Sequence, residues 1–191
     1  MGKIILGSSS PRRADILKKL KLDFEIIPSS YVEPHDMTDF SYTYVKNLAY
    51  NKALDVAKKL KEKAVVIGAD TIVVLDNKIL GKPKNKQDAY DTLALLSGKT
   101  HSVVTAVAVV SSPELKTKVK SETTYVTFEN LTNEQIKYYI ENYKPLDKAG
   151  SYGIQELPSG YVKSVDGDID NVIGLPSKLV IEILNNFELK D

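Results

Sequence analysis

The segment from Ala64 to Leu75, which reads AVVIGADTIVVL, constrains the fold more than any other part of the chain. Its apolar, β-branched residues are typical of a strand in the core of a protein. Asp70 stands in the middle of this run, where a buried carboxylate is costly unless it pairs with a cation or binds a metal. We therefore expect Asp70 to serve a functional site, to bridge to a lysine or to cap a neighbouring helix. Gly68 and Ala69 are small enough for a ligand to approach the strand, which favours a site.

Strands and helices alternate along the rest of the chain. Apolar β-rich runs predict strands at 3–6, 24–27, 64–75, 78–81, 101–111 and 119–129. Helical spacing and capping signals predict helices at 11–21, 41–61, 86–97, 132–143 and 177–185. This order predicts an α/β fold with a mixed central sheet flanked by helices, in a single domain spanning residues 1–191. We expect the polar loops at 28–40 and 146–170 to face each other across a cleft.

The composition excludes several classes of protein. The chain has no cysteine, which rules out disulfides, iron–sulfur clusters and Cys-ligated zinc. Its two histidines, His35 and His101, lie far apart in the sequence, so any metal is expected to be magnesium or manganese on oxygen ligands. A net charge of +1 does not suggest a nucleic-acid binder. The purest apolar run, residues 103–110, is too short to cross a membrane, so we expect a cytoplasmic protein.

The segment from Gly7 to Arg13 is a candidate phosphate site. A strand ends at Gly7, and a helix is expected to begin after Ser10 as its N-cap, with Pro11 in the first helical position. Free N–H groups at a helix N-terminus attract anions, whereas Arg12 and Arg13 there oppose the helix dipole. A bound phosphate would relieve that cost. The alternative is a solvated surface helix with an ordinary serine cap.

Other charged residues recur near the predicted loops. Glu33, Lys82 and Asp147 would each, taken alone, be solvated charges. Lys52 falls on the apolar stripe of its helix, so it either extends to the edge of that helix or points into a site. The series Asp166, Asp168 and Asp170 lacks the glutamate of a calcium loop and is interpreted as a polar turn.

Several ordered motifs together resemble the Maf family of nucleoside triphosphate pyrophosphatases. They are SSSPRR from Ser8, Glu33, NKA from Asn51, GADT from Gly68, GKP from Gly81, LLSGKTH from Leu95, PLDKAGSYGIQ from Pro145 and NVIGLP from Asn171. The resemblance covers essentially the whole chain. It implies a fold related to the inosine triphosphate pyrophosphatases, with two lobes around a deep cleft, a divalent metal, a cytoplasmic location and a possible homodimer.

The resemblance also implies roles for individual residues. Asp70 would be the proton acceptor that activates water, and Glu33 with Asp70 would hold the metal. The implied phosphate-binding residues are Ser8, Arg13, Lys52 and Lys82. The implied specificity residues are Arg12, Thr71 and Gln155, which agree with the branch of the family that acts on dTTP and UTP. The branch acting on 7-methyl-GTP tends to carry Trp, Gln and Glu there.

The expected function is therefore hydrolysis of dTTP and UTP to the monophosphate and pyrophosphate. One alternative is a broader house-cleaning pyrophosphatase that prefers modified nucleotides. Another is a non-catalytic nucleotide sensor linked to cell division. Pyrophosphate release from a panel of nucleotides distinguishes the three.

Overall fold

The computed structural model describes residues 2–34 and 37–187, so His35 lies outside the described residues. Its seven-stranded mixed sheet has the order β2-β1-β3-β5-β6-β7, and β4 pairs with β3 off this path. The strands are β1 (Lys3–Leu6), β2 (Glu25–Ile26), β3 (Ala64–Leu75), β4 (Lys78–Leu80), β5 (Thr100–Ser112), β6 (Thr117–Phe128) and β7 (Val162–Asp166). Pairing of β1 with β2 and β3 is parallel, and the other pairings are antiparallel. The predicted mixed sheet is confirmed.

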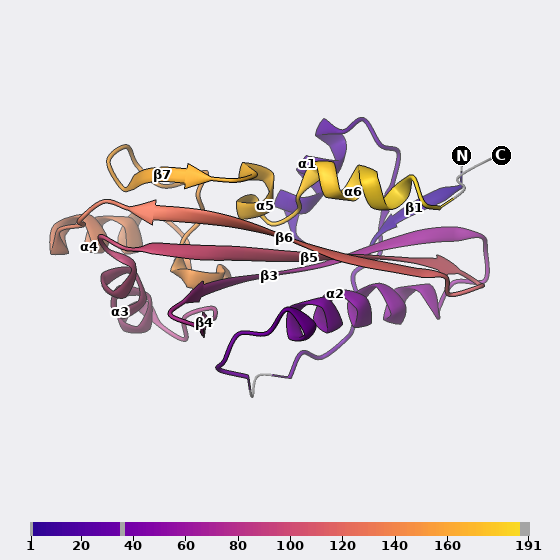
Figure 1. Cartoon of the computed structure of the whole chain (residues 1–191), viewed down its shortest axis with the longest axis horizontal. Helices are drawn as coiled ribbons and strands as arrows, with labels where there is room; N and C mark the ends of the chain where they lie inside the picture. The colour runs from indigo at the N-terminus through magenta and orange to yellow at the C-terminus, as the bar shows by residue number, and fades with distance from the viewer. Residues whose placement is uncertain (1, 35–36, 188–191) are drawn as a thin grey trace.

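Helices cover both faces of this sheet (Figure 1). They are α1 (Pro11–Lys19), α2 (Tyr42–Ala57), α3 (Lys86–Leu96), α4 (Asn133–Asn142), α5 (Ile169–Ile173) and α6 (Ser177–Leu184), with short 3₁₀ turns η1 (Pro145–Asp147) and η2 (Ala149–Ser151). In Figure 1, α2 lies below the long strands and α1 and α6 lie above them, while α3 and α4 gather at the opposite end. Among the described residues, no helix is both long enough and apolar enough to span a bilayer.

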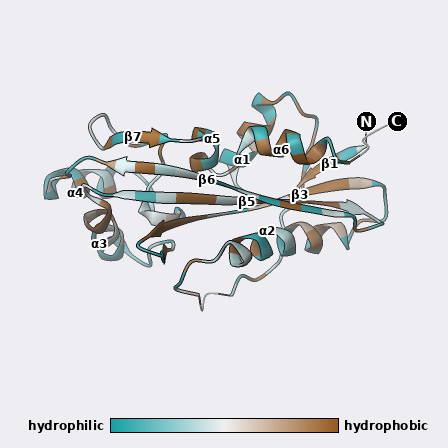
Figure 2. Cartoon of the chain, in the orientation of Figure 1, coloured by the Kyte–Doolittle hydropathy of each residue, from teal (hydrophilic) through white to brown (hydrophobic). Residues whose placement is uncertain are grey.

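Side chains of β3 pack into three separate hydrophobic cores, because successive residues of a strand point to opposite faces of the sheet. Val65, Ile67 and Ala69 pack with α1 and α6 on one face. Residues of the other parity, including Val66 and Ile72, pack with α2 on the opposite face. The end of β3 joins a third core with α3 and α4. Figure 2 shows the hydrophobic colouring along β3 that this double-sided burial requires.

A gap beside the middle of β3 interrupts the sheet. β1 pairs with residues 64–67 of β3, and β4 pairs with residues 73–75 on that same side. Within the described residues, no strand flanks positions 68–72 there. Asp70 and Thr71 lie in this gap and, as neighbours in a strand, point to opposite faces of the sheet. The gap is therefore the place where side chains from both faces can reach one cleft.

Gly68 allows α2 to approach β3 closely. A Cβ at this position would lie 2.5 Å from the carbonyl oxygen of Ala49 and 2.6 Å from the amide nitrogen of Ala53. Ala69 is fully buried in the core beneath α1. The expectation that Gly68 and Ala69 make room for a ligand is therefore wrong, because helix and core atoms fill the space around both. The close contact instead brings α2 to the face of β3 that carries Asp70.

The segment at 146–170, predicted as a loop with short strands at best, contains more regular structure than expected. It holds η1, η2, β7 and the start of α5. The interpretation of the aspartate series as a polar turn is also corrected. Asp166 ends β7, Asp168 caps α5 by accepting from the amide of Asp170, and Asp170 is itself buried. Capping by a side chain explains why this polar sequence forms a helix.

Gly68→Ala is expected to lower the free energy of unfolding by about 1–3 kcal/mol, because the added methyl group collides with α2 backbone that cannot rotate away. Urea unfolding measures the change. Gly81→Ala is the matched control, since a Cβ there meets nothing within 4 Å. Equal stability of the two variants would contradict the close contact between α2 and β3.

Candidate functional site

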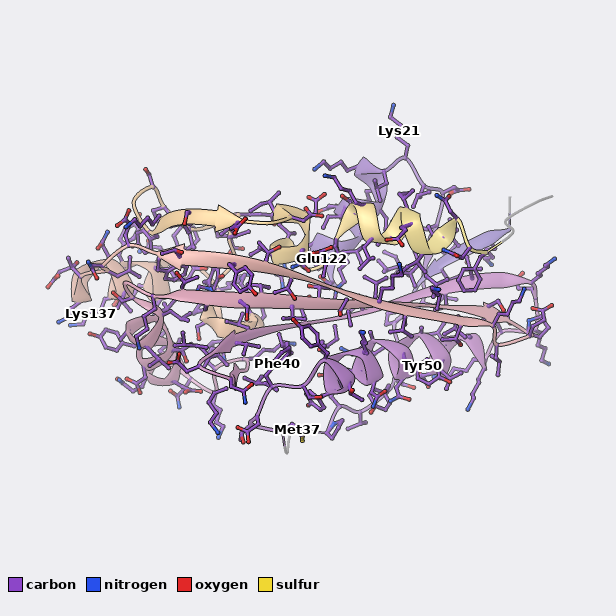
Figure 3. All side chains as sticks on the ribbon, viewed as in Figure 1. Lys21, Met37, Phe40, Tyr50, Glu122 and Lys137 are labelled. Atoms are coloured by element: carbon purple, nitrogen blue, oxygen red, sulfur yellow. The ribbon has the colours of Figure 1, made fainter. Side chains whose placement is uncertain are left out.

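A cleft of about 760 Å³ opens at the gap in the sheet. Its walls include Tyr31, Glu33 and Met37 from the first polar loop and residues 147–149 and 152–155 from the second. The prediction that these two loops face each other across a cleft is thus confirmed, and Figure 3 shows Met37 on the loop beside α2. A second hollow of about 380 Å³, lined by residues 7–13, adjoins the cleft. The division into two lobes stays a prediction.

Asp70 is 6% exposed and points toward α2, where Lys52 reaches it. The ammonium of Lys52 lies 2.5 Å from Oδ1 of Asp70 and 2.7 Å from Oε1 of Glu33. Burial raises the pKa of Asp70 above its ordinary value, and the charge of Lys52 opposes that rise. Lys52 thus points into the site, and the bridge from Asp70 to a lysine exists alongside its place in the cleft wall.

The loop that carries Glu33 is tied to α2. Asp55 accepts hydrogen bonds from the Ser30 amide at 2.8 Å and the Ser29 hydroxyl at 2.9 Å. Its bond with Lys59 is the main reason that the pKa of Asp55 falls to about 2. The hydroxyl of Tyr44 donates to the carbonyl of Pro34 at 2.8 Å. These contacts place Glu33 over Lys52 from both sides of the loop.

The N-terminus of α1 faces the second hollow. Ser10 occupies the N-cap position, but within the described chain its side chain makes no capping bond, so the predicted serine cap is wrong in that detail. Ser8 instead accepts from the Ser10 amide at 3.2 Å and from Nη1 of Arg13 at 3.3 Å. Lys82 is exposed and lines both hollows. N–H groups and cations therefore meet here, as an anion site requires.

Arg13 and Thr71 are joined on the opposite face of the sheet from Asp70. Arg13 donates from Nε to the Gly174 carbonyl at 2.9 Å and from Nη2 to Thr71 Oγ1 at 3.3 Å. Thr71 also lies 2.9 Å from the hydroxyl of Thr105, which donates to the Asn171 carbonyl. Desolvation lowers the pKa of Arg13, and the charge of Asp70 acts in the opposite direction. Arg13 and Thr71 therefore share the Gly174 carbonyl as a hydrogen-bond acceptor.

Arg12 points elsewhere. Its Nη1 lies 3.4 Å from Oδ2 of Asp147, at the second polar loop. Gln155 is exposed and lines the same cleft as Arg12 and Thr71. Neighbouring positions on a helix differ by about 100° in direction, which accounts for the separate targets of Arg12 and Arg13. All three predicted specificity residues, Arg12, Thr71 and Gln155, therefore line the same cleft.

The segment that carries Gln155 is anchored from behind. The hydroxyl of Tyr152 lies 2.7 Å from Nε2 of His101, and both rings pack edge-on against Phe128. The amide of Gly153 donates to the hydroxyl of Tyr139 at 3.0 Å. A buried aromatic cluster thus positions the backbone next to Gln155.

Sequence reasoning assigned no role to two residues that the structure brings into the site. Thr105 lies opposite Thr71 on β5 and is fully buried. Lys148 lines the cleft at 4% exposure, in contact with Asp147 and Glu156. A signal for Lys148 existed, because this lysine lies within PLDKAGSYGIQ, the longest of the family motifs. Thr105 had no such signal, because only strand pairing brings it to Thr71.

Glu33 and Asp70 are the oxygen ligands predicted for a divalent cation. The described residues contain no cluster of three or more His, Cys, Asp or Glu side chains that could enclose a metal. Mg²⁺ commonly takes one or two carboxylates and completes its coordination with water and substrate phosphates. Glu33 and Asp70, beside the candidate phosphate site, therefore fit a cation that arrives with a phosphorylated ligand.

Residues 3–187 match the family model described as Maf-like protein. The chain is 47% identical over 191 residues to the dTTP/UTP pyrophosphatase of Alkaliphilus oremlandii (strain OhILAs), covering 99% of this chain and 98% of that protein. It is 44% identical over 182 residues to the dTTP/UTP pyrophosphatase of Thermoanaerobacter sp. (strain X514), covering 95% of each.

Among solved structures, a HAM1 protein from Coxiella burnetii has a TM-score of 0.53 at 15% identity, covering 97% of this chain and 100% of that one. At that identity the likeness shows the fold alone. The predicted fold class, a mixed sheet flanked by helices, is confirmed, and the HAM1 protein shares this fold.

Burial of His101 makes stability depend on pH. Its pKa falls from 6.5 to about 4, so the folded chain keeps the ring neutral while the unfolded chain protonates below 6.5. The free energy of unfolding should fall as pH drops from 6.5 toward 4, by about 2 kcal/mol from this group at pH 5. Urea unfolding of the parent and of His101→Gln at pH 7.5 and 5 tests this. The variant should lose less stability over that interval; parallel losses would contradict the assignment.

Proposed function

This chain belongs to the Maf family, and we propose that it hydrolyses dTTP and UTP to the nucleoside monophosphate and pyrophosphate. The observation that carries the proposal is Asp70, a buried carboxylate bound to Lys52 in the floor of a cleft that Arg13 and Lys82 also line. The three cations suit a substrate with several negative charges. The carboxylate beside them suits a reaction in which water attacks that substrate. The choice of dTTP and UTP as substrates rests on the names of relatives that are 40–47% identical over most of the chain.

In this proposal, water attacks the α-phosphorus and Asp70 accepts the proton that the water releases. A new bond forms between the water oxygen and phosphorus, and the bond from the α-phosphorus to the bridging oxygen breaks. Pyrophosphate leaves with the electron pair of that bond. Burial makes Asp70 a stronger base than a surface aspartate, and Lys52 favours its charged form.

The cations would bind the triphosphate. An ammonium has three N–H donors, and Lys52 directs two of them at Glu33 and Asp70, which leaves a third for a phosphate oxygen. Arg13, Lys82 and Ser8 line the hollow at the N-terminus of α1, whose dipole adds to the attraction. A magnesium or manganese ion held by Glu33 and Asp70 would, when bound, polarise the phosphate oxygens.

Arg12, Thr71 and Gln155 would select the base. The side-chain amide of Gln155 offers a donor and an acceptor to the edge of a uracil or thymine ring. Thr71 would act beside Arg13, which it contacts. A cytoplasmic location and a homodimer complete the proposal; light scattering on the purified chain tests the latter.

Asp70→Asn should lower turnover of dTTP and UTP by at least about 100-fold, because it removes the proton acceptor while keeping the side-chain shape. Pyrophosphate release with magnesium, across a panel of standard and modified nucleotides, is the measurement. Nucleotide binding should persist in part through the cations. A variant close to the parental rate would contradict the role of Asp70. A parent that prefers modified nucleotides would instead favour the house-cleaning enzyme, and one that binds without turnover would favour the sensor.

Replacing Arg12, Thr71 and Gln155 together with Trp, Gln and Glu should shift preference from dTTP and UTP toward 7-methyl-GTP. A Glu suits that cationic base, and a Trp stacks on it. A competition assay gives the ratio of kcat/KM values for the two substrates. An unchanged ratio in a folded, active variant would remove these three residues from base selection.

A further inference from the structure

Lys148 is a buried lysine whose ammonium makes two hydrogen bonds and a further ion pair within the protein. Its side chain is 4% exposed, and its Nζ lies 2.5 Å from the Lys144 carbonyl, 2.9 Å from Oδ1 of Asp147 and 3.0 Å from Oε2 of Glu156. An ammonium has three donors, and three acceptors surround this one. Lys148 therefore lines the cleft with its ammonium engaged by the protein's own acceptors.

The contact with Asp147 connects Lys148 to Arg12. Asp147 places Oδ1 against Lys148 and Oδ2 against Nη1 of Arg12 at 3.4 Å, so one carboxylate joins the two cations. These two cations together lower the pKa of Asp147, although burial opposes them as the largest single effect. The direction in which Arg12 points thus depends on where Lys148 holds Asp147.

The contact with Glu156 connects Lys148 to Gln155. Glu156 follows Gln155 directly, and its amide donates back to the Gly153 carbonyl at 2.9 Å. Gly153 lies against the lysine stem, since a Cβ there would be 2.8 Å from Cε of Lys148. Within the described residues, Oε2 of Glu156 is buried and has no hydrogen-bond donor, which leaves the ion pair with Lys148 as its compensation. Both ends of the Gln155 turn therefore touch Lys148.

We propose that Lys148 is a positioning residue that fixes Arg12 and Gln155 relative to each other at the base end of the cleft. This inference rests on the proposed function, because it assigns Lys148 to the selection of the base. Without the ammonium, Asp147 and Glu156 lose their common partner and their like charges repel. Arg12 then follows Asp147, the turn that carries Gln155 follows Glu156, and the two groups that read the base separate.

The charges around Lys148 also fit an uncharged base. Arg12 and Lys148 contribute two positive charges, and Asp147 and Glu156 contribute two negative charges. The base end is therefore electrically balanced, whereas the phosphate end adds Lys82 and the N-terminus of α1 to its ion pairs. A neutral pyrimidine meets no net charge there, and a cationic base gains no attraction from it.

The test is Lys148→Met, which keeps the length of the stem and removes the charge, with Lys137→Met as control. Lys137 is an exposed lysine on α4 that points into solvent in Figure 3. UTP and CTP carry the same triphosphate and differ only in the base, so a merely structural defect lowers kcat/KM for both equally. We expect the ratio of kcat/KM for UTP over CTP to fall at least about tenfold in Lys148→Met, mainly through KM for UTP, and to stay unchanged in the control.

A double-mutant cycle adds a second readout. If Lys148 acts through Arg12, Arg12→Ala and Lys148→Met together should change the ratio by less than the product of their separate effects. An unchanged ratio in folded Lys148→Met, or effects that simply multiply, overturns the proposal for Lys148. A parent chain that releases no pyrophosphate from UTP or dTTP overturns the proposed function itself.

If Lys148→Met does not fold, Glu156→Gln decides the question. This variant removes the charge from one contact of Lys148 and leaves the lysine in place. The UTP-to-CTP ratio should fall in the same direction by about threefold or more, as expected for loss of one partly exposed charge contact. An unchanged ratio in this folded variant overturns the proposal.

Discussion

Lys52 reaches Asp70 inside the central sheet from α2 and favours its charged form against the effect of burial, and that reach depends on how closely α2 can approach β3. Gly68 is the position that allows the approach, since any Cβ there would meet the backbone at Ala49 and Ala53. The same ammonium contacts Glu33, so a loop, a helix and a strand converge on one nitrogen. A buried ion pair of this kind adds little net stability. Its role here is to favour the charged form of a carboxylate at the floor of a cleft.

The gap between β1 and β4 gives that carboxylate access to a ligand. Both strands pair with the same side of β3 and leave positions 68–72 unflanked in the described sheet. Side chains from both faces reach the cleft there, so Asp70 with Lys52 serves one face and Thr71 with Arg13 serves the other. Because β1 leads directly into α1, the N-terminus of a helix also meets the cleft. One interruption in the sheet thus gathers the groups that a nucleotide would need.

The two ends of the cleft are built differently. The end proposed to bind the phosphates is lined by exposed side chains such as Lys82. At the end proposed to bind the base, the backbone is held by the His101–Tyr152 contact, by Tyr139 and by Lys148. Phosphate binding tolerates mobile cations because charge attraction has little directional preference. Recognition of a base edge requires hydrogen bonds of defined direction, which a rigid support provides.

The sequence by itself determined the mixed α/β architecture, because β-branched runs, helical spacing and caps are local signals. The helix predicted at 132–143 is present, and a capping box of Thr132 and Gln135 opens it. Asp70 was recognisable as a candidate site residue because burying a carboxylate in an apolar strand is energetically costly. The ordered motifs indicated the family. Only the tertiary structure decided which groups meet. Thr71 pairs with Arg13, Gly68 admits a helix instead of a ligand, and Lys148 connects Arg12 to the Gln155 turn across more than a hundred residues. Such contacts depend on strand register and on helix packing, which bring distant residues together and leave no periodic trace in the sequence.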